Sequence, residues 1–149
     1  MTKKNRVALP RGLRTFNRVL KAVLGTGIRV GGIRVLTVRG RTSGQPRSTP
    51  VTPYEVDGAC YVLAGIPGAD WVRNARAAGE GVLAHGRRKK RVRLIEVPTA
   101  EQGPMLRAFP EQVPNGVEMM VKAGVVTGGS PDEFEALAGR CTVFRVVDA

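Results

Sequence analysis

A short basic segment between two apolar runs carries the residue types best suited to bind an anion. It spans residues 40–50 and reads GRTSGQPRSTP. Its two arginines, Arg41 and Arg47, carry fork-shaped donors that match phosphate or carboxylate oxygens. Its two glycines, Gly40 and Gly44, let the backbone turn and bring N–H groups close to a ligand. The segment predicts an anion-binding loop; the alternative is a solvated basic loop whose glycines only form the turn.

The runs on either side of this segment have the pattern of β-strands. Apolar and polar side chains alternate over residues 33–39, and residues 51–56 also have the composition of a strand. The basic segment should therefore connect two strands. Its spacing matches neither a Walker loop nor a dinucleotide fingerprint, so spacing alone does not identify the anion.

Two stretches of the chain resemble a known family of reductases. Residues 36–51 and 70–77 are similar to the deazaflavin-dependent nitroreductase family, and the likeness extends from about Leu36 to Val97 and more loosely to the last strand. The resemblance implies a mainly β fold, a split β-barrel with added helices. It also implies hydride transfer from reduced coenzyme F420 to an electron-poor small molecule, which would be a quinone, an enone or a nitro compound.

The resemblance further implies which residues bind the cofactor. The basic segment matches the family's phosphate site, the position of Pro50 lines the deazaflavin pocket, and the positions of Trp71 and Asn74 lie beside it. The full set is Arg41, Thr42, Ser43, Gly44, Arg47, Pro50, Val51, Ala64, Gly65, Trp71, Val72 and Asn74. The chain departs from the family where Thr42 replaces a common lysine and where Ala64-Gly65-Ile66 replaces a serine–lysine step. The resemblance thus leaves open whether F420 binding is weakened or the preference shifts to flavin mononucleotide, FMN.

The residues by themselves offer no catalytic constellation. There is no nucleophile elbow, no recognisable cysteine–histidine pair and no set of metal ligands. An enzyme with this sequence must take its chemistry from a cofactor. The proton could come from solvent, from Tyr54 or Tyr61, or from a hydroxyl near the substrate. Two alternatives stay open: a protein that binds F420 or another phosphorylated ligand without turnover, and an FMN-dependent enzyme.

The charge of the chain predicts an anionic partner. Its 149 residues carry a formal net charge of +12, which attracts polyanions. A phosphorylated cofactor, nucleic acid and an anionic membrane all fit, and the resemblance favours the first because F420 has a charged tail. The run from Arg87 to Arg91 is typical of a nucleic-acid patch. No aromatic residues interleave with it to stack bases, so we expect no nucleic-acid partner.

The length of the chain predicts a single domain. We divide it into residues 1–32, an N-terminal amphipathic helix with its linker, and residues 33–149, the split barrel. Apolar side chains recur at helical spacing over residues 9–24, and cations lie largely off that face. This helix could pack on the barrel, wall the substrate site or contact an anionic membrane surface. The cations interrupt every apolar run, so we predict no membrane span or signal peptide and a cytoplasmic protein. Homodimer formation stays open.

Further elements follow from turn and capping signals. Asp57-Gly58 predicts a hairpin, and Asp70 is a candidate cap for a helix from Trp71 to about Ala78 that Gly79 closes. Cys60 and Cys141 read as buried apolar residues in strands. The remaining expected elements are a hairpin of strands 81–85 and 91–97, helices opening at Thr99, Asn115 and Ser130, and a strand over 141–147.

Overall fold

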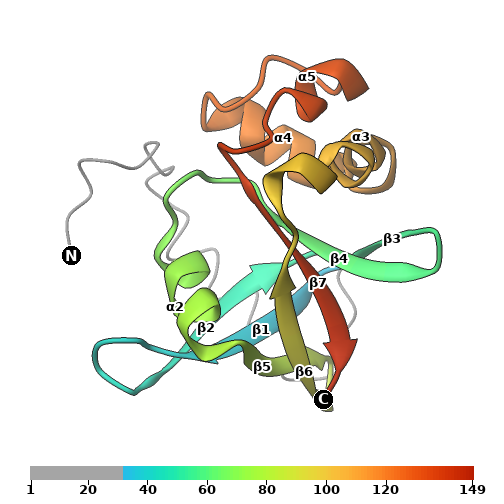
Figure 1. Ribbon diagram of the computed structural model, residues 1–149. Coiled ribbons are helices and arrows are strands. Elements are labelled where there is room, and N and C mark those ends of the chain that lie inside the picture. The colour runs from blue at the N-terminus through green and yellow to red at the C-terminus, as the bar shows by residue number, and fades with distance from the viewer. Residues whose placement is uncertain (1–31) are drawn as a thin grey trace.

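The computed structural model describes residues 32–149, so the predicted helix at residues 9–24 and the proposed division at residue 32 lie largely outside the described residues. The described chain forms seven strands and four α-helices (Figure 1). The elements are β1 (Arg34–Arg39), β2 (Pro46–Val51), β3 (Tyr54–Val56), β4 (Ala59–Ala64), α2 (Asp70–Ala78), β5 (Glu80–His85), β6 (Arg88–Glu96), the 3₁₀ helix η1 (Thr99–Glu101), α3 (Gly103–Gln112), α4 (Pro114–Lys122), α5 (Pro131–Glu135) and β7 (Thr142–Asp148).

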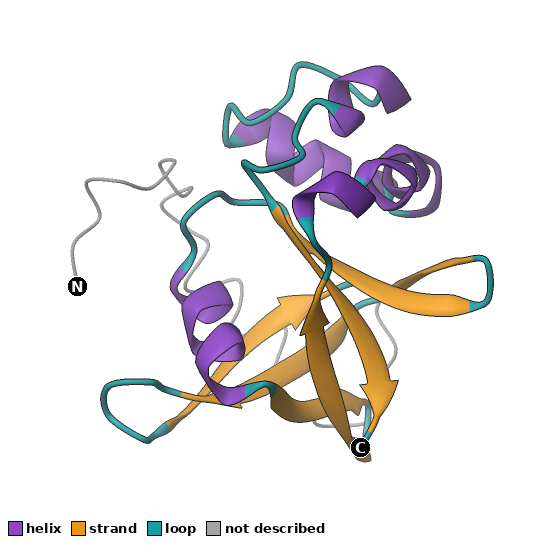
Figure 2. Cartoon of the chain, viewed as in Figure 1, coloured by secondary structure: helices purple, strands orange, loops and turns teal. Residues whose placement is uncertain are grey.

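All seven strands belong to one antiparallel sheet in the order β2-β1-β5-β6-β7-β4-β3. The sheet is strongly curled, and β2 at one edge also contacts β4 near the opposite end. The helices α3, α4 and α5 gather beyond one end of the sheet, while α2 lies alongside β1 and β2 (Figure 2). This architecture confirms the predicted mainly β fold of the split-barrel type.

Two hydrophobic clusters hold the layers together. The first fills the inside of the curled sheet, where Leu36, Val92 and Phe144 are at most 1% exposed and Ala75 of α2 covers them. The second joins the sheet to the α3–α5 layer around Phe134 and Leu106, which are fully buried. Complete burial of large apolar side chains on both sides of the sheet is the main source of stability for such a layered domain.

A side-chain amide fixes the helical layer to the edge strand β3. The Glu55 N–H donates to Gln112 Oε1 over 3.2 Å, and Gln112 Nε2 donates to the Glu55 carbonyl over 2.7 Å. Gln112 therefore pairs with β3 as a neighbouring strand would, which satisfies backbone groups that an edge leaves open. Tyr54 adds a second tether, because its hydroxyl donates to the Met105 carbonyl over 2.8 Å.

The basic segment is only partly a loop. Residues 40–45 form the turn, but Pro46–Val51 is the strand β2, paired with β1 from Arg39↔Pro46 to Arg34↔Val51. The expectation of a loop up to residue 50 was wrong, because residues 46–50 are already paired with β1. Pro46 and Pro50 lie four residues apart on an edge strand, where their missing N–H groups face away from β1 and cost no ladder hydrogen bond.

The other hairpins follow their turn residues. Asp57 and Gly58 both have positive φ, 51° and 80°, which confirms the predicted turn between β3 and β4. The predicted strand over residues 51–56 is interrupted at Thr52 and Pro53. The turn between β5 and β6 comprises only residues 86–87, so β6 begins earlier than the residue 91 expected from charge. Two cations of β6 form ion pairs: Lys90 with Asp148, and Arg91 with Glu80.

The helix ends agree with the sequence in part. Gly79 closes α2 in the left-handed conformation with φ 70°, and Ser130 Oγ accepts the Glu133 N–H over 3.3 Å at the start of α5. Asp70, however, is the first residue of α2, and the cap position is Ala69. Thr99 opens a short 3₁₀ helix rather than α3, which starts at Gly103 with Pro104 in its first turn.

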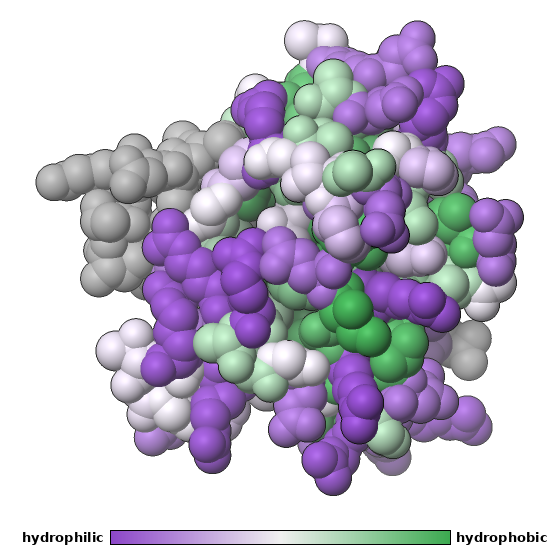
Figure 3. All heavy atoms as spheres, viewed as in Figure 1, coloured by the Kyte–Doolittle hydropathy of each residue, from purple (hydrophilic) through white to green (hydrophobic). Residues whose placement is uncertain are grey.

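The surface is largely hydrophilic, as Figure 3 shows for one face. Among the described residues, Ile95 and Val121 are the large hydrophobic side chains that stay exposed. None of the helices within residues 32–149 has the length and apolar character needed to span a membrane. Both cysteines are free thiols: Cys60 lies in β4, and Cys141 lies immediately before β7, where burial raises its pKa to about 11.

Candidate cofactor-binding cleft

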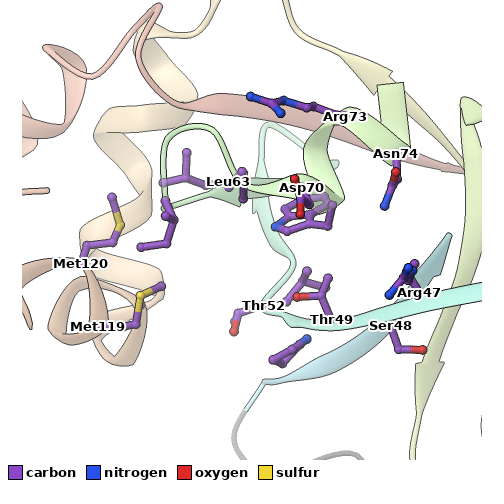
Figure 4. A pocket seen from close by; sticks show the side chains of 18 of the residues that line it. Arg47, Ser48, Thr49, Thr52, Leu63, Asp70, Arg73, Asn74, Met119 and Met120 are labelled. Atoms are coloured by element: carbon purple, nitrogen blue, oxygen red, sulfur yellow. The ribbon is translucent and has the colours of Figure 1, made fainter. Parts of the chain in front are cut away.

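A cleft of about 940 Å³ opens between β2, the end of β4, α2 and the α3–α4 layer. Its two ends differ in chemistry, as the close-up in Figure 4 shows: Arg47 and Asn74 lie at one end, and Met119 and Met120 lie at the other. A continuous cleft with one polar and one apolar end suits an elongated ligand that is charged at one end only.

The polar end is built on strand alternation in β2. Arg47 and Thr49 lie opposite Val38 and Leu36 of β1, so these pairs share the face that turns into the curled sheet. On the opposite face, Ser48 Oγ is 2.8 Å from Thr37 Oγ1. Within residues 32–149 the Arg47 side chain makes no ion pair or hydrogen bond, so its guanidinium is available to a ligand in the cleft.

The backbone of the turn contributes less than expected. Gly40 N donates to the Gln45 carbonyl over 2.8 Å and Gly44 N donates to the Gly40 carbonyl over 2.9 Å. Gln45 N donates to Ser43 Oγ over 3.1 Å. The tight turn thus uses the glycine N–H groups internally, and the expectation that they point at a phosphate was wrong. Anion binding at this end must depend mainly on side chains and on the remaining turn N–H groups.

Arg41 is fixed to α2. Asn74 Oδ1 accepts the Arg41 backbone N–H over 3.0 Å and Arg41 Nη1 over 2.7 Å. Arg41 Nη1 also lies 3.5 Å from the Asp70 carbonyl, and Arg41 Nη2 lies 3.9 Å from Asp70 Oδ1. Asn74 is only 6% exposed, whereas the side chain of Arg41 is 35% exposed. The guanidinium is therefore held at the cleft wall with part of its surface open.

The middle and the apolar end of the cleft come from four elements. Trp71 of α2 lines the middle, and its ring packs on Phe144 of the inner core at a centroid distance of 5.8 Å. Beyond it, the end of β4 faces the helical layer. The apolar lining there consists of Leu63, Ile66, Phe109, Val113, Gly116, Met119 and Met120.

Contact between β4 and α4 is close at this end. A Cβ atom at Gly65 would lie 2.9 Å from Cγ and Sδ of Met120 and 3.6 Å from Cε of Met119. Met120 is fully buried and so fills the space that a side chain at residue 65 would need. The absence of a side chain at Gly65 therefore lets α4 pack directly against the end of β4.

The structure brings ten of the twelve predicted site residues to this cleft. Gly44 is in the turn, with φ 75°, but is not part of the lining. Val72 points into the inner core and is 5% exposed. The ten residues that line the cleft are Arg41, Thr42, Ser43, Arg47, Pro50, Val51, Ala64, Gly65, Trp71 and Asn74. Their contact with a cofactor stays a prediction.

From the sequence we expected the segment from Val113 to Gly129 to lie over the ring, but we identified no individual residue of this helical wall of the cleft. Phe109, Val113, Gly116 and Met120 recur at intervals of four, three and four residues, which is one face of a helix. This spacing indicates a shared helical face, but the pattern was obscured because it runs across the break between α3 and α4 at Pro114. Arg73 was also missed; it lines the cleft from the exposed side of α2.

Neither tyrosine can serve as the proton donor. Tyr54 and Tyr61 are 3% and 6% exposed, and neither lines the cleft. The Tyr54 hydroxyl already donates to the Met105 carbonyl, and burial together with the neighbouring Tyr61 raises its pKa. Of the open alternatives, solvent and the cleft hydroxyls remain, and Thr49 and Thr52 lie along the β2 side (Figure 4).

Replacing Tyr54 with phenylalanine tests this exclusion. We expect the Tyr54→Phe variant to lose about 1–2 kcal/mol of unfolding free energy, because the Met105 carbonyl loses its donor. Turnover per folded molecule should not change. Urea unfolding and steady-state kinetics on the same preparation measure both quantities, and a large fall in kcat with unchanged stability would reinstate the tyrosine as a donor.

The curled antiparallel sheet with its two-ended cleft defines a protein of the split β-barrel type. Solved structures share this fold. A protein of unknown function from Agrobacterium tumefaciens str. C58 superposes with a TM-score of 0.53 at 18% identity, covering 95% of this chain and 57% of that one. A NimC/NimA family protein from Clostridium acetobutylicum superposes with a TM-score of 0.50 at 15% identity, and the match covers 91% of this chain and 81% of that one. A domain-swapped dimer superposes with a TM-score of 0.50 at 19% identity, and the match covers 87% of this chain and 95% of that one.

The chain belongs to the F420H(2)-dependent quinone reductase family, whose model matches residues 11–122. It is therefore a member of an oxidoreductase family that uses F420, which confirms the predicted class of reductase and its cofactor in place of FMN. No curated protein matches the chain in sequence.

The residues of the cleft fit such a cofactor. A Cβ atom at Gly40 would lie 3.0 Å from Ser43 Oγ and 3.1 Å from the Gln45 carbonyl oxygen, so the turn is as compact as a glycine allows. The turn brings hydroxyls and two guanidinium groups to the same end of the cleft, and these are donors that match an anionic tail. The remaining length offers apolar walls for a flat ring.

Proposed function

We propose that the protein uses F420H2 to reduce an electron-poor small molecule, foremost a quinone, in the cleft between β2, β4 and α4. One observation carries this proposal: a basic end and an apolar end are joined in a single cleft of about 940 Å³. The charge at one end suits the tail of the cofactor, and the apolar end suits an uncharged acceptor with a flat ring.

In this proposal, Arg41, Arg47 and the hydroxyls of Thr42 and Ser43 hold the anionic tail. Each guanidinium can offer paired donors to phosphate oxygens. The ring would lie along Pro50 and Val51 of β2 and along Ala64 and Gly65 at the end of β4, with Trp71 at its side. When bound, F420H2 supplies a hydride; the protein's part is to hold the acceptor close and in line, which is a large share of the rate in such reactions.

The polar residues of the cleft leave the proton to solvent or to a hydroxyl of β2. Thr49 and Thr52 are half-buried, and neither side chain makes a hydrogen bond within residues 32–149. Their hydroxyls can therefore contact an acceptor oxygen or a water molecule at the cleft mouth.

Reduction assays test the proposed function. Purified protein is mixed with F420H2 and menadione, cyclohexenone or a nitroimidazole, and the return of F420 fluorescence is followed. The proposal predicts turnover with the quinone. Saturable F420 binding without turnover of any of the three acceptors would favour the alternative of a cofactor-binding protein.

Met119 should set the size of acceptor that the apolar end admits. Its side chain is partly buried at that end and flexible, and its Cε lies near Gly65. We expect Met119→Ala to raise the ratio of kcat/KM for a bulky naphthoquinone over benzoquinone by about tenfold, because removing methylene groups from a pocket wall changes discrimination by that order.

Val121→Ala is the matched control for this measurement. Val121 lies two residues further along α4 and is 40% exposed, outside the cleft lining. The control should leave the ratio unchanged. An equal change of the kcat/KM ratio in both variants would show that substitutions in α4 alter this ratio through the stability of the helix and not through contact with the acceptor. An unchanged ratio in both variants would place the acceptor elsewhere.

The oligomeric state stays a prediction. One of the solved structures with this fold is a domain-swapped dimer, and we propose a homodimer for this chain on that basis and on the family likeness. Sedimentation velocity at micromolar concentration distinguishes a dimer from a monomer of 16.0 kDa. Contact with a membrane surface depends on residues 9–24 and likewise stays a prediction.

A further inference from the structure

A single buried atom, Asn74 Oδ1, accepts hydrogen bonds from both the backbone and the guanidinium of Arg41. Asn74 Oδ1 accepts the backbone N–H of Arg41 over 3.0 Å and its Nη1 over 2.7 Å. Both partners are donors, so the amide of Asn74 must present its oxygen to them. Asn74 is the fifth residue of α2, and only 6% of it is exposed, so the acceptor cannot turn away into solvent.

This arrangement fixes a side chain that would otherwise be free to move. An arginine on an exposed turn has considerable rotamer freedom, and binding a ligand must remove it. The Asn74 oxygen removes part of that freedom before any ligand arrives. Because a guanidinium has five N–H donors, Arg41 can keep its bond to Asn74 and still offer others to an anion.

Asp70 lies on the other side of the same guanidinium. Its Oδ1 is 3.9 Å from Arg41 Nη2, and the two side chains are 34% and 35% exposed. Asp70 also lines the cleft. At this distance and exposure the ion pair is weak, so an anion with better geometry can replace the carboxylate beside Arg41. The carboxylate nevertheless repels any anion in its vicinity.

We propose that Asn74 is a positioning residue that presets Arg41 for the anionic tail of the cofactor, and that Asp70 is the counter-ion which the tail displaces. The proposal rests on the proposed function, because it takes the tail of F420 to bind at Arg41. It assigns opposite effects to two neighbouring polar residues of α2: Asn74 strengthens binding through Arg41, and Asp70 weakens it.

A double-mutant cycle on F420 affinity tests the role of Asn74. Oxidised F420 is titrated into the wild type, Arg41→Ala, Asn74→Ala and the double variant, and its fluorescence is followed. Arg41→Ala should weaken binding at least tenfold and Asn74→Ala about fivefold to tenfold, as expected for charge-assisted hydrogen bonds. The double variant should bind only slightly more weakly than Arg41→Ala alone, because the loss of the Arg41 side chain leaves Asn74 only its bond to the backbone N–H of residue 41.

A second cycle with Arg47 separates positioning from a general structural effect. Arg47 lies on β2 and makes no hydrogen bond with Asn74 among the described residues. The effects of Arg47→Ala and Asn74→Ala should therefore multiply. If Asn74→Ala instead lost its effect in both backgrounds, or if its effect multiplied with that of Arg41→Ala, Asn74 would not act through Arg41 and the proposal would be overturned.

The Asp70→Asn variant tests the counter-ion and needs no buried substitution. It should tighten F420 binding about threefold to tenfold at low salt, and less at high salt, because one nearby like charge is removed. The gain should vanish in the Arg41→Ala background. Unchanged or weaker binding of Asp70→Asn would contradict the proposal, even if Asn74→Ala proved too unstable to purify.

These outcomes distinguish the inference from the proposed function. Failure of the wild type to bind F420 at micromolar protein, or identical binding by wild type and Arg47→Ala, counts against the proposed function itself. Normal binding that Arg47→Ala weakens, combined with independent effects of Arg41 and Asn74, counts only against the positioning role.

Discussion

Replacing Arg47 with alanine is expected to weaken F420 binding about 10-fold to 100-fold while leaving the fold intact. The guanidinium lies on the inward face of β2 at the polar end of the cleft and has no other partner within residues 32–149. Loss of hydrogen bonds to a charged group costs about 1.5–3 kcal/mol, which is this range of affinity. Because Arg47 is exposed and makes no ion pair or hydrogen bond with the part of the chain that the structure describes, the thermal midpoint should change little.

Arg87→Ala provides the control for charge. Arg87 is exposed in the turn between β5 and β6 and does not line the cleft, yet its removal changes the net charge by the same amount. F420 affinity of this variant should stay within about twofold of wild type at 0.15 M salt, where distant charges are screened. Equal weakening by both substitutions would show that only overall charge attracts the cofactor.

The second large effect is expected at Gly116, where α4 passes over Phe109. A Cβ atom there would lie 2.6 Å from Phe109 Cζ and 2.9 Å from Val113 Cγ1. The Phe109 ring cannot yield, because it stacks on Phe134 at 5.5 Å and meets Tyr54 edge-on at 5.3 Å. Overpacking of this kind costs about 1–3 kcal/mol, which outweighs or offsets the gain of about 1 kcal/mol from replacing a helical glycine with alanine.

We therefore expect Gly116→Ala to lower the unfolding free energy by up to about 2 kcal/mol and to narrow the apolar end of the cleft. Urea unfolding measures the first effect, and KM for menadione, which should rise, measures the second. Gly128→Ala is the matched control, because a Cβ at Gly128 meets nothing within 4 Å. A Gly116→Ala protein as stable as that control would mean that α4 can shift away from α3 at no cost.

The polar end of the cleft could be predicted from sequence because its residues are adjacent in the chain. Arg41, Thr42, Ser43 and Arg47 all belong to one hairpin, so turn chemistry alone places them together. Asn74 joined them only through the family likeness. Nothing local indicates that α2 returns to the first hairpin, since the contact between Asn74 and Arg41 spans 33 residues.

The apolar end could not be predicted, because it forms only when distant elements pack. Gly65 directly follows β4 and Met120 lies on α4, and neither position is distinctive when its own segment is considered alone. Their mutual fit, in which a methionine occupies the space above a glycine, depends on tertiary packing that no local pattern encodes. The partner of Asp70 could not be predicted either. An aspartate just before an apolar helix favours a capping role, but tertiary packing brings its carboxylate to Arg41.

A crystal structure of the protein with F420 tests the central claim most directly, because it locates both ends of the ligand in one measurement. We predict density for the anionic tail beside Arg41 and Arg47, with the ring extending along Pro50 and Ala64 toward Met119. Density for the tail at any other surface, with the turn of residues 40–45 unoccupied, would contradict the account.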